Sequence, residues 1–131
     1  MVLTDRHFAG LLAVRSDLAE FHSGGERLAQ QLGLSHVQHH VLLSVRGHPV
    51  PDGPRVGDVA QALHIASPSA VELIARLVRA GLVQRQPDPQ DRRATRLALS
   101  ELGDRAVHQL SQDHLPRLRE LANRAAARLS D

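Results

Sequence analysis

Residues 81–103, which read GLVQRQPDPQDRRATRLALSELG, decide the fold. Val83 and Arg85 alternate with polar neighbours over 82–86, which is typical of a β-strand, and a second short strand is predicted over 94–99. The residues between them, 87–93, are polar and contain two prolines, as expected for a turn. The stretch therefore predicts a β-hairpin that projects as a wing.

Two short helices are predicted immediately before the hairpin. The first covers 56–63 with an apolar face, and a tight turn over 64–66 follows it. Ser67 followed by Pro68 is typical of a helix start, and a possible capping box from Ser69 to Glu72 overlaps it. The second helix ends before Gly81, and its inner face is predicted to consist of Val71, Ile74, Leu77 and Val78. Two helices joined by a short turn indicate a helix-turn-helix unit.

Longer helices are predicted at both ends of the chain. Thr4 is a suitable N-cap for an N-terminal helix, whose Ser23–Gly25 stretch leaves open whether it is one helix or two. Its apolar seam is Leu11, Val14, Leu18, Phe21, Leu28 and Leu32. A further helix is expected over 35–46, with Val37, Val41, Leu42 and Val45 inside. Ser100 begins the last helical region, which Pro116 should kink or divide.

These elements predict a mostly α protein with a small β-hairpin wing, in which residues 35–99 form a winged helix-turn-helix domain. The apolar seams of the terminal helices are too long for a small central domain to cover. A second copy of the chain is the natural partner for such surfaces. We therefore expect residues 1–34 and 100–131 to be dimerisation regions of a homodimer.

Composition narrows the possible functions. Aromatic residues make up 2% of the 131 residues, which argues against single-stranded nucleic-acid binding by base stacking, and the lack of cysteine excludes thiolate metal sites and thiol switches. The formal charge is +2, with −1 in residues 1–54, +3 in 55–99 and 0 in 100–131. A basic central region is compatible with double-stranded DNA or with a solvated surface. No signal peptide or membrane span is indicated, so a cytoplasmic location is expected.

The hairpin sequence resembles that of the MarR-type winged helix-turn-helix transcription regulators. The similar features are Gly81-Leu82-Val83, the D-x-x-D-R-R turn at 88–93, and Leu97-Ala98-Leu99-Ser100 followed by Gly103. The order of helices is also similar. The resemblance implies a dimeric DNA-binding regulator, expected to be a repressor, with a possible small-molecule effector bound between the terminal helices and the winged domain.

This interpretation predicts a DNA-contacting surface made of the second helix and the wing. Arg92 is predicted to enter the minor groove while Asp91 braces Arg93, although the two arginines are interchangeable in these roles. Ser and Glu side chains on the helix could contact base edges, and other arginines phosphates. The predicted DNA-binding residues are Arg55, Ser67, Ser69, Glu72, Leu73, Arg76, Arg85, Asp91, Arg92, Arg93 and Arg96.

Two alternatives come from the same residues. A winged-helix domain could bind an acidic protein partner through the basic patch. His36, His39 and His40 have helical spacing that can place imidazoles near a metal, which would make the chain a metal-dependent regulator, but no acidic residue accompanies them locally. The sequence has no nucleophile elbow, phosphate-binding glycine loop or HExxH motif, so no enzyme activity and no cofactor are expected.

Overall fold

The computed structural model describes all residues, 1–131, and contains five helices and one hairpin. None of the helices is apolar over a length sufficient to cross a membrane. The elements are α1 (Asp5–Gln31), α2 (His36–Arg46), α3 (Val56–Leu63), α4 (Ser67–Arg79), β1 (Val83–Pro87), β2 (Thr95–Leu99) and α5 (Glu101–Leu129).

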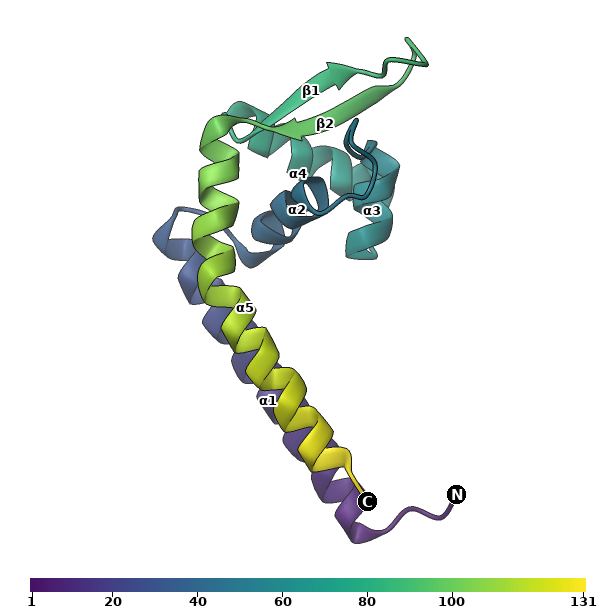
Figure 1. Ribbon diagram of the computed structural model, residues 1–131, viewed down its shortest axis with the longest axis vertical. Coiled ribbons are helices and arrows are strands. Elements are labelled where there is room, and N and C mark those ends of the chain that lie inside the picture. The colour runs from purple at the N-terminus through teal and green to yellow at the C-terminus, as the bar shows by residue number, and fades with distance from the viewer.

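The molecule has a compact head and a long stalk (Figure 1). Helices α2, α3 and α4 and the hairpin form the head. Helices α1 and α5 run side by side to form the stalk, and both chain ends lie at its far end. The hairpin projects from the side of the head opposite to the stalk. The fold class predicted from the sequence, a mostly α winged helix-turn-helix, is confirmed.

The core of the head is aliphatic, as the scarcity of aromatic residues requires. Leu42 from α2, Ile74 and Leu77 from α4, and Leu97 from β2 are almost completely buried in one cluster. Each buried side chain of this size contributes about 1.5–3 kcal/mol by leaving water. The hairpin therefore belongs to the same core as the helix-turn-helix unit and is held in a fixed orientation.

The junction between hairpin and α5 explains part of the quoted motif. The strands pair antiparallel with Val83 opposite Leu99. Ser100 caps α5 by accepting a hydrogen bond from the Gly103 amide at 3.0 Å. A Cβ at position 103 would collide with the Leu82 carbonyl. Glycine at this position thus allows α5 to start in direct contact with the end of the α4–β1 connection.

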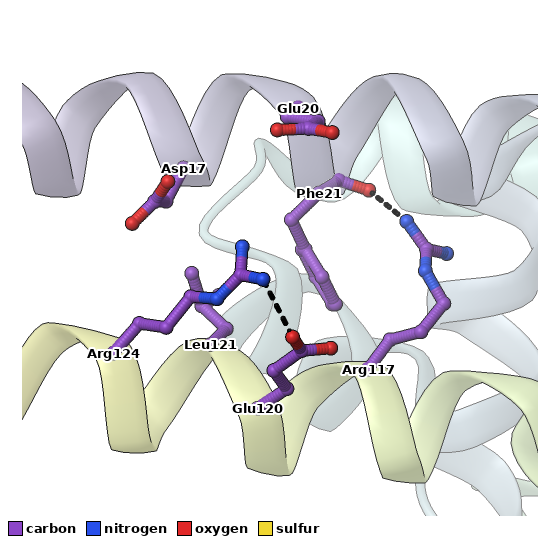
Figure 2. A pocket seen from close by; sticks show the side chains of 7 residues that line it. All are labelled: Asp17, Glu20, Phe21, Arg117, Glu120, Leu121 and Arg124. Atoms are coloured by element: carbon purple, nitrogen blue, oxygen red, sulfur yellow. Dashed lines mark hydrogen bonds and ion pairs between the residues drawn. The ribbon is translucent and has the colours of Figure 1, made fainter.

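Helix α1 forms one half of the stalk and is continuous through Ser23–Gly25, so of the two alternatives left open there the single helix is found. The Arg117 guanidinium of α5 lies beside Gly24, and a side chain at position 24 would displace it. Figure 2 shows Arg117 beside Phe21, whose carbonyl accepts a hydrogen bond from Arg117 Nη2 at 3.2 Å.

Pro116 does not divide α5, which runs unbroken from Glu101 to Leu129. The helix axis changes direction part-way along its length (Figure 1). A proline lacks the amide hydrogen and its ring crowds the preceding turn, so it favours a bend of this kind. The predicted kink therefore occurs without a break.

Candidate nucleic-acid interface

Helix α4 presents its N-terminal half to solvent, but its buried face is rotated relative to the prediction. The helix begins at Ser67 and its N-cap is Ala66, so the N-cap predicted at Ser67 is one residue too late. The residues buried on α4 are Ala70, Ile74 and Leu77. Val71, predicted to be inside, is 51% exposed.

The exposed face of α4 therefore contains Ser67, Ser69, Val71, Glu72 and Arg76. Leu73, predicted to face DNA, is half-buried and packs against the core. Arg76 Nε donates to Glu72 Oε1 at 3.0 Å one turn away, and both side chains are 60% exposed. An exposed pair of this kind is weak and can exchange its partners for base or phosphate groups.

Asp88, which the sequence analysis assigned no binding role, is the organising residue of the wing. It is 3% exposed, and its Oδ2 accepts hydrogen bonds from Arg96 Nε at 2.8 Å and Arg55 Nη2 at 2.9 Å. Its Oδ1 accepts from the amides of Gln90 and Asp91 at 2.8 and 3.2 Å. The amide of Gln90, followed by Arg96, holds the pKa of the Asp88 carboxyl well below its usual range.

This arrangement changes the roles of two predicted phosphate-binding arginines. Arg96 is largely buried and also donates to the Gly53 carbonyl at 2.9 Å, so its charge is used inside the protein. Arg55 is half-exposed and is the N-cap of α3. Together with Asp88 they tie β2, the turn of the wing and the loop before α3 to one another.

Asp91 contacts Arg93, which it was predicted to brace, but not through the guanidinium group. Its carboxylate instead accepts a hydrogen bond from the Arg93 backbone amide at 3.0 Å, which shapes the tip of the turn. Arg92 and Arg93 are exposed at that tip, and neither makes an ion pair. Arg85 is exposed on β1. Three guanidinium groups of the wing thus face solvent and can meet an external anion.

Removing the Asp88 carboxylate is expected to loosen the wing. Asp88→Ala leaves Arg96 and Arg55 without their shared partner and two turn amides without an acceptor, which is costly in a buried position. We expect a melting temperature several degrees lower and faster hydrogen exchange in β1 and β2. Asp91→Ala, which removes a single exposed acceptor, is the matched control. Equal effects of the two substitutions would contradict the assigned role of Asp88.

A second candidate site lies where the stalk meets the head. A cavity of 220 Å³ is lined by Phe21, His22, Gly25, His36, His39, His40, Leu43 and His114. His36 pairs with Glu26, whereas His39 points toward His114. No group of three or more His, Cys, Asp or Glu side chains is arranged to hold a metal ion, so the structure does not bring the three predicted histidines together as ligands.

A smaller cavity of 110 Å³ lies between α1 and α5 and contains several charges (Figure 2). Arg124 donates to Glu120 at 2.6 Å, and the Arg117 guanidinium lies 5.2 Å from the centre of the Phe21 ring. Asp17, which also lines it, accepts from Arg128 at 2.7 Å. Two of these contacts join the helices, since Arg128 pairs with Asp17 and Arg117 donates to the Phe21 carbonyl, whereas Arg124 and Glu120 both belong to α5.

Comparison with known proteins agrees with this architecture. Residues 32–94 match the model of the MarR family. The transcriptional activatory protein BadR of Rhodopseudomonas palustris is 32% identical over 91 residues, which are 70% of this chain. The match covers 52% of the length of that curated relative, so the chain spans about half of it.

Two solved structures show how much of the fold is shared. A mutant of S. aureus MepR bound to an oligodeoxyribonucleotide is 26% identical, with a TM-score of 0.69 over 83% of this chain and 78% of that one. AbsC, a MarR family regulator from Streptomyces coelicolor, is 22% identical, with a TM-score of 0.74 over 92% and 81%. Residues 32–94 therefore form a MarR-family domain, and the chain as a whole has the fold of the winged helix-turn-helix transcription regulators of that family.

Proposed function

We propose that this protein is a homodimeric regulator that binds a specific double-stranded DNA operator in the cytoplasm. The observation that carries the proposal is the exposed face of α4 beside a wing whose tip carries two unpaired arginines, Arg92 and Arg93. A helix of this kind fits the major groove, and arginines are attracted to the narrow minor groove beside it. Members of the family are regulators, so an enzyme activity is not expected.

Each side chain has a distinct role in the proposed complex. Ser67, Ser69, Glu72 and Arg76 contact base edges or nearby phosphates from α4, and the exposed Val71 is placed to touch a thymine methyl group. Arg92 and Arg93 enter the minor groove, and Arg85 contacts phosphate. Asp91, Arg55, Arg96 and Asp88 hold the wing at the required angle. The relative bound to an oligodeoxyribonucleotide supports this general mode of binding.

The proposed dimer interface is the apolar surface of the stalk. On α5, Leu115, Leu118 and Leu129 are exposed, and on α1 Phe8, Leu11, Leu12 and Leu18 are exposed as well. Residues 115, 118, 122, 125 and 129 follow alternating three- and four-residue steps, which is the spacing of a helix-packing seam. Two copies joined here would present two α4 helices to successive major grooves about 34 Å apart on a pseudo-palindromic site.

We further propose that the protein is a repressor released by a small-molecule effector. Occupation of an operator is sufficient to block another protein, and the histidine-lined cavity lies between the stalk and the head. An effector that prefers a different stalk-to-head arrangement would lower operator affinity by its difference in binding free energy. A promoter–reporter assay with and without this protein measures the sign of regulation, and higher reporter output with the protein present would contradict repression.

Fluorescence anisotropy with a labelled random duplex at several salt concentrations tests DNA binding itself. The proposed function predicts binding that weakens steeply with salt, because each neutralised phosphate contributes about 0.9 to the slope of log K against log salt. Selection of bound genomic fragments then supplies the operator. A protein that binds no duplex at low salt would instead favour the protein-interaction function.

A further inference from the structure

Five histidines from three helices meet at the junction of stalk and head. His22 comes from α1, His36, His39 and His40 from α2, and His114 from α5, and all line the 220 Å³ cavity. Phe21 packs among them, with ring centres 5.9 Å from His22 and 5.1 Å from His114. The sequence shows only part of this cluster, since residues 22, 36 and 114 are far apart in the chain.

His39 is the most constrained member of the cluster. It is 6% exposed, and its Nε2 atom has no hydrogen-bond partner. Its ring meets that of His114 edge-on, with centres 5.2 Å apart. Burial, together with His114 and His40, lowers the pKa of His39 to about 4. A proton on His39 therefore has no local partner to stabilise it.

The charges around the cluster add to this effect. The groups that face it are His22 and Glu26 from α1, His36 and His40 from α2, His64 from α3, and Asp113, His114 and Arg117 from α5. Burial and then Arg117 lower the pKa of His114, whereas Asp113 raises it. Glu26 is already paired with His36. No carboxylate is therefore available beside His39 to balance the positive charge that a proton would bring to its imidazole.

We propose that this histidine cluster makes DNA binding sensitive to acid, because protonation of His39 separates α2 from α5 and changes the angle between head and stalk. The inference rests on the proposed function, since it concerns regulation of the same DNA-binding surface. Packing of α2 against α5 requires neutral imidazoles, whereas a separated arrangement exposes His39 to water. Acid thus favours the separated arrangement, in which two heads no longer match successive grooves.

The size of the effect follows from linkage. His39 binds a proton with a pKa of about 4 when packed and about 6.5 when exposed to water. The lowered pKa means that the packed arrangement is fully favoured above pH 6.5 and loses its advantage as the pH falls toward 4. Between pH 7.5 and 5.5 the equilibrium moves toward the separated arrangement by about tenfold in each protomer.

The test compares operator affinity at pH 7.5 and pH 5.5 for three proteins, with the duplex obtained by genomic selection as the probe. The wild type is expected to lose affinity on acidification, by up to about tenfold for each protomer. His39→Phe keeps an aromatic ring but cannot be protonated, so its affinity should change much less. His108→Gln on α5 is the matched control, because His108 is exposed and bonds only to Asp104; its loss should equal that of the wild type.

A second measurement needs no DNA. In the free protein, NMR titration of the imidazole signals should show a His39 pKa of about 4, and His114→Phe should move the His39 pKa upward. Equal loss of affinity in wild type and His39→Phe, or a His39 pKa near 6.5, would overturn the inference while leaving the DNA-binding function in place. Absence of duplex binding at both pH values would instead remove the proposed function, and the NMR result would still decide whether His39 resists protonation.

Discussion

Replacing both Arg92 and Arg93 by alanine is expected to weaken operator binding by roughly a hundredfold or more at physiological salt. The two guanidinium groups extend from the tip of the wing without partners in the protein, so their charge is available to DNA. A dimer loses four positive charges, and the slope of log K against log salt should fall by about 3 to 4. The fold should be unaffected, because neither side chain contributes to the core.

Anisotropy titrations of wild type and variant at four salt concentrations measure both quantities. The matched control is Arg27→Ala with Arg105→Ala, which removes the same charge from exposed positions on α1 and α5. This control should keep most of the operator affinity and most of the slope of log K against log salt. If the wing variant binds like the wild type with an unchanged slope, the wing does not contact DNA.

Leu118→Glu is expected to convert the dimer to a monomer and to reduce operator affinity by two orders of magnitude or more. Leu118 is 42% exposed in the middle of the α5 seam, so in a dimer the glutamate would be buried without a counter-charge. Two linked heads bind a two-part operator far more tightly than one head, because the second contact is made within the same complex. Loss of the dimer therefore removes most of the affinity.

Sedimentation equilibrium and operator titrations check this result. Leu102→Glu provides a control with the same chemistry, since Leu102 is 48% exposed at the start of α5, outside the seam. It should remain dimeric and bind DNA. A Leu118→Glu protein that stays dimeric would show that the partner surface lies elsewhere.

The hairpin could be predicted from sequence because local chemistry determines it. Alternating residues, two prolines and a glycine before the first strand all favour one structure, and the strands lie within a residue or two of the prediction. Gly81, with a positive φ of 78°, ends the preceding helix as expected. The hairpin and the helix end at Gly81 are determined by residues close to them in the chain, so both could be predicted without information on distant contacts.

The inner face of α4 could be predicted only in part. Ile74 and Leu77 are buried as predicted, and Val78 packs against the core, but Ala70 is buried where Val71 was expected. Small Ala70 is completely buried in the core, and this close packing depends on the neighbouring elements rather than on α4 itself. The rotation places Val71 in the candidate interface and Leu73 outside it.

The role of Asp88 was missed for a related reason. The turn sequence shows two aspartates and two arginines, which suggests pairing among neighbours. In the structure the partners of Asp88 come from Arg55, 33 residues earlier, and from Arg96 on β2. The contact at Gly24 is similarly distant in sequence, because the side chain beside it is that of Arg117.

In the proposed complex, two copies of this chain place two helices and two wings on one DNA duplex. Analytical ultracentrifugation of the protein with a labelled operator duplex measures this directly through the mass of the complex. We predict a complex of two chains per duplex and a dimer in the absence of DNA. A monomer that forms no complex with the selected duplex at low salt would contradict the account.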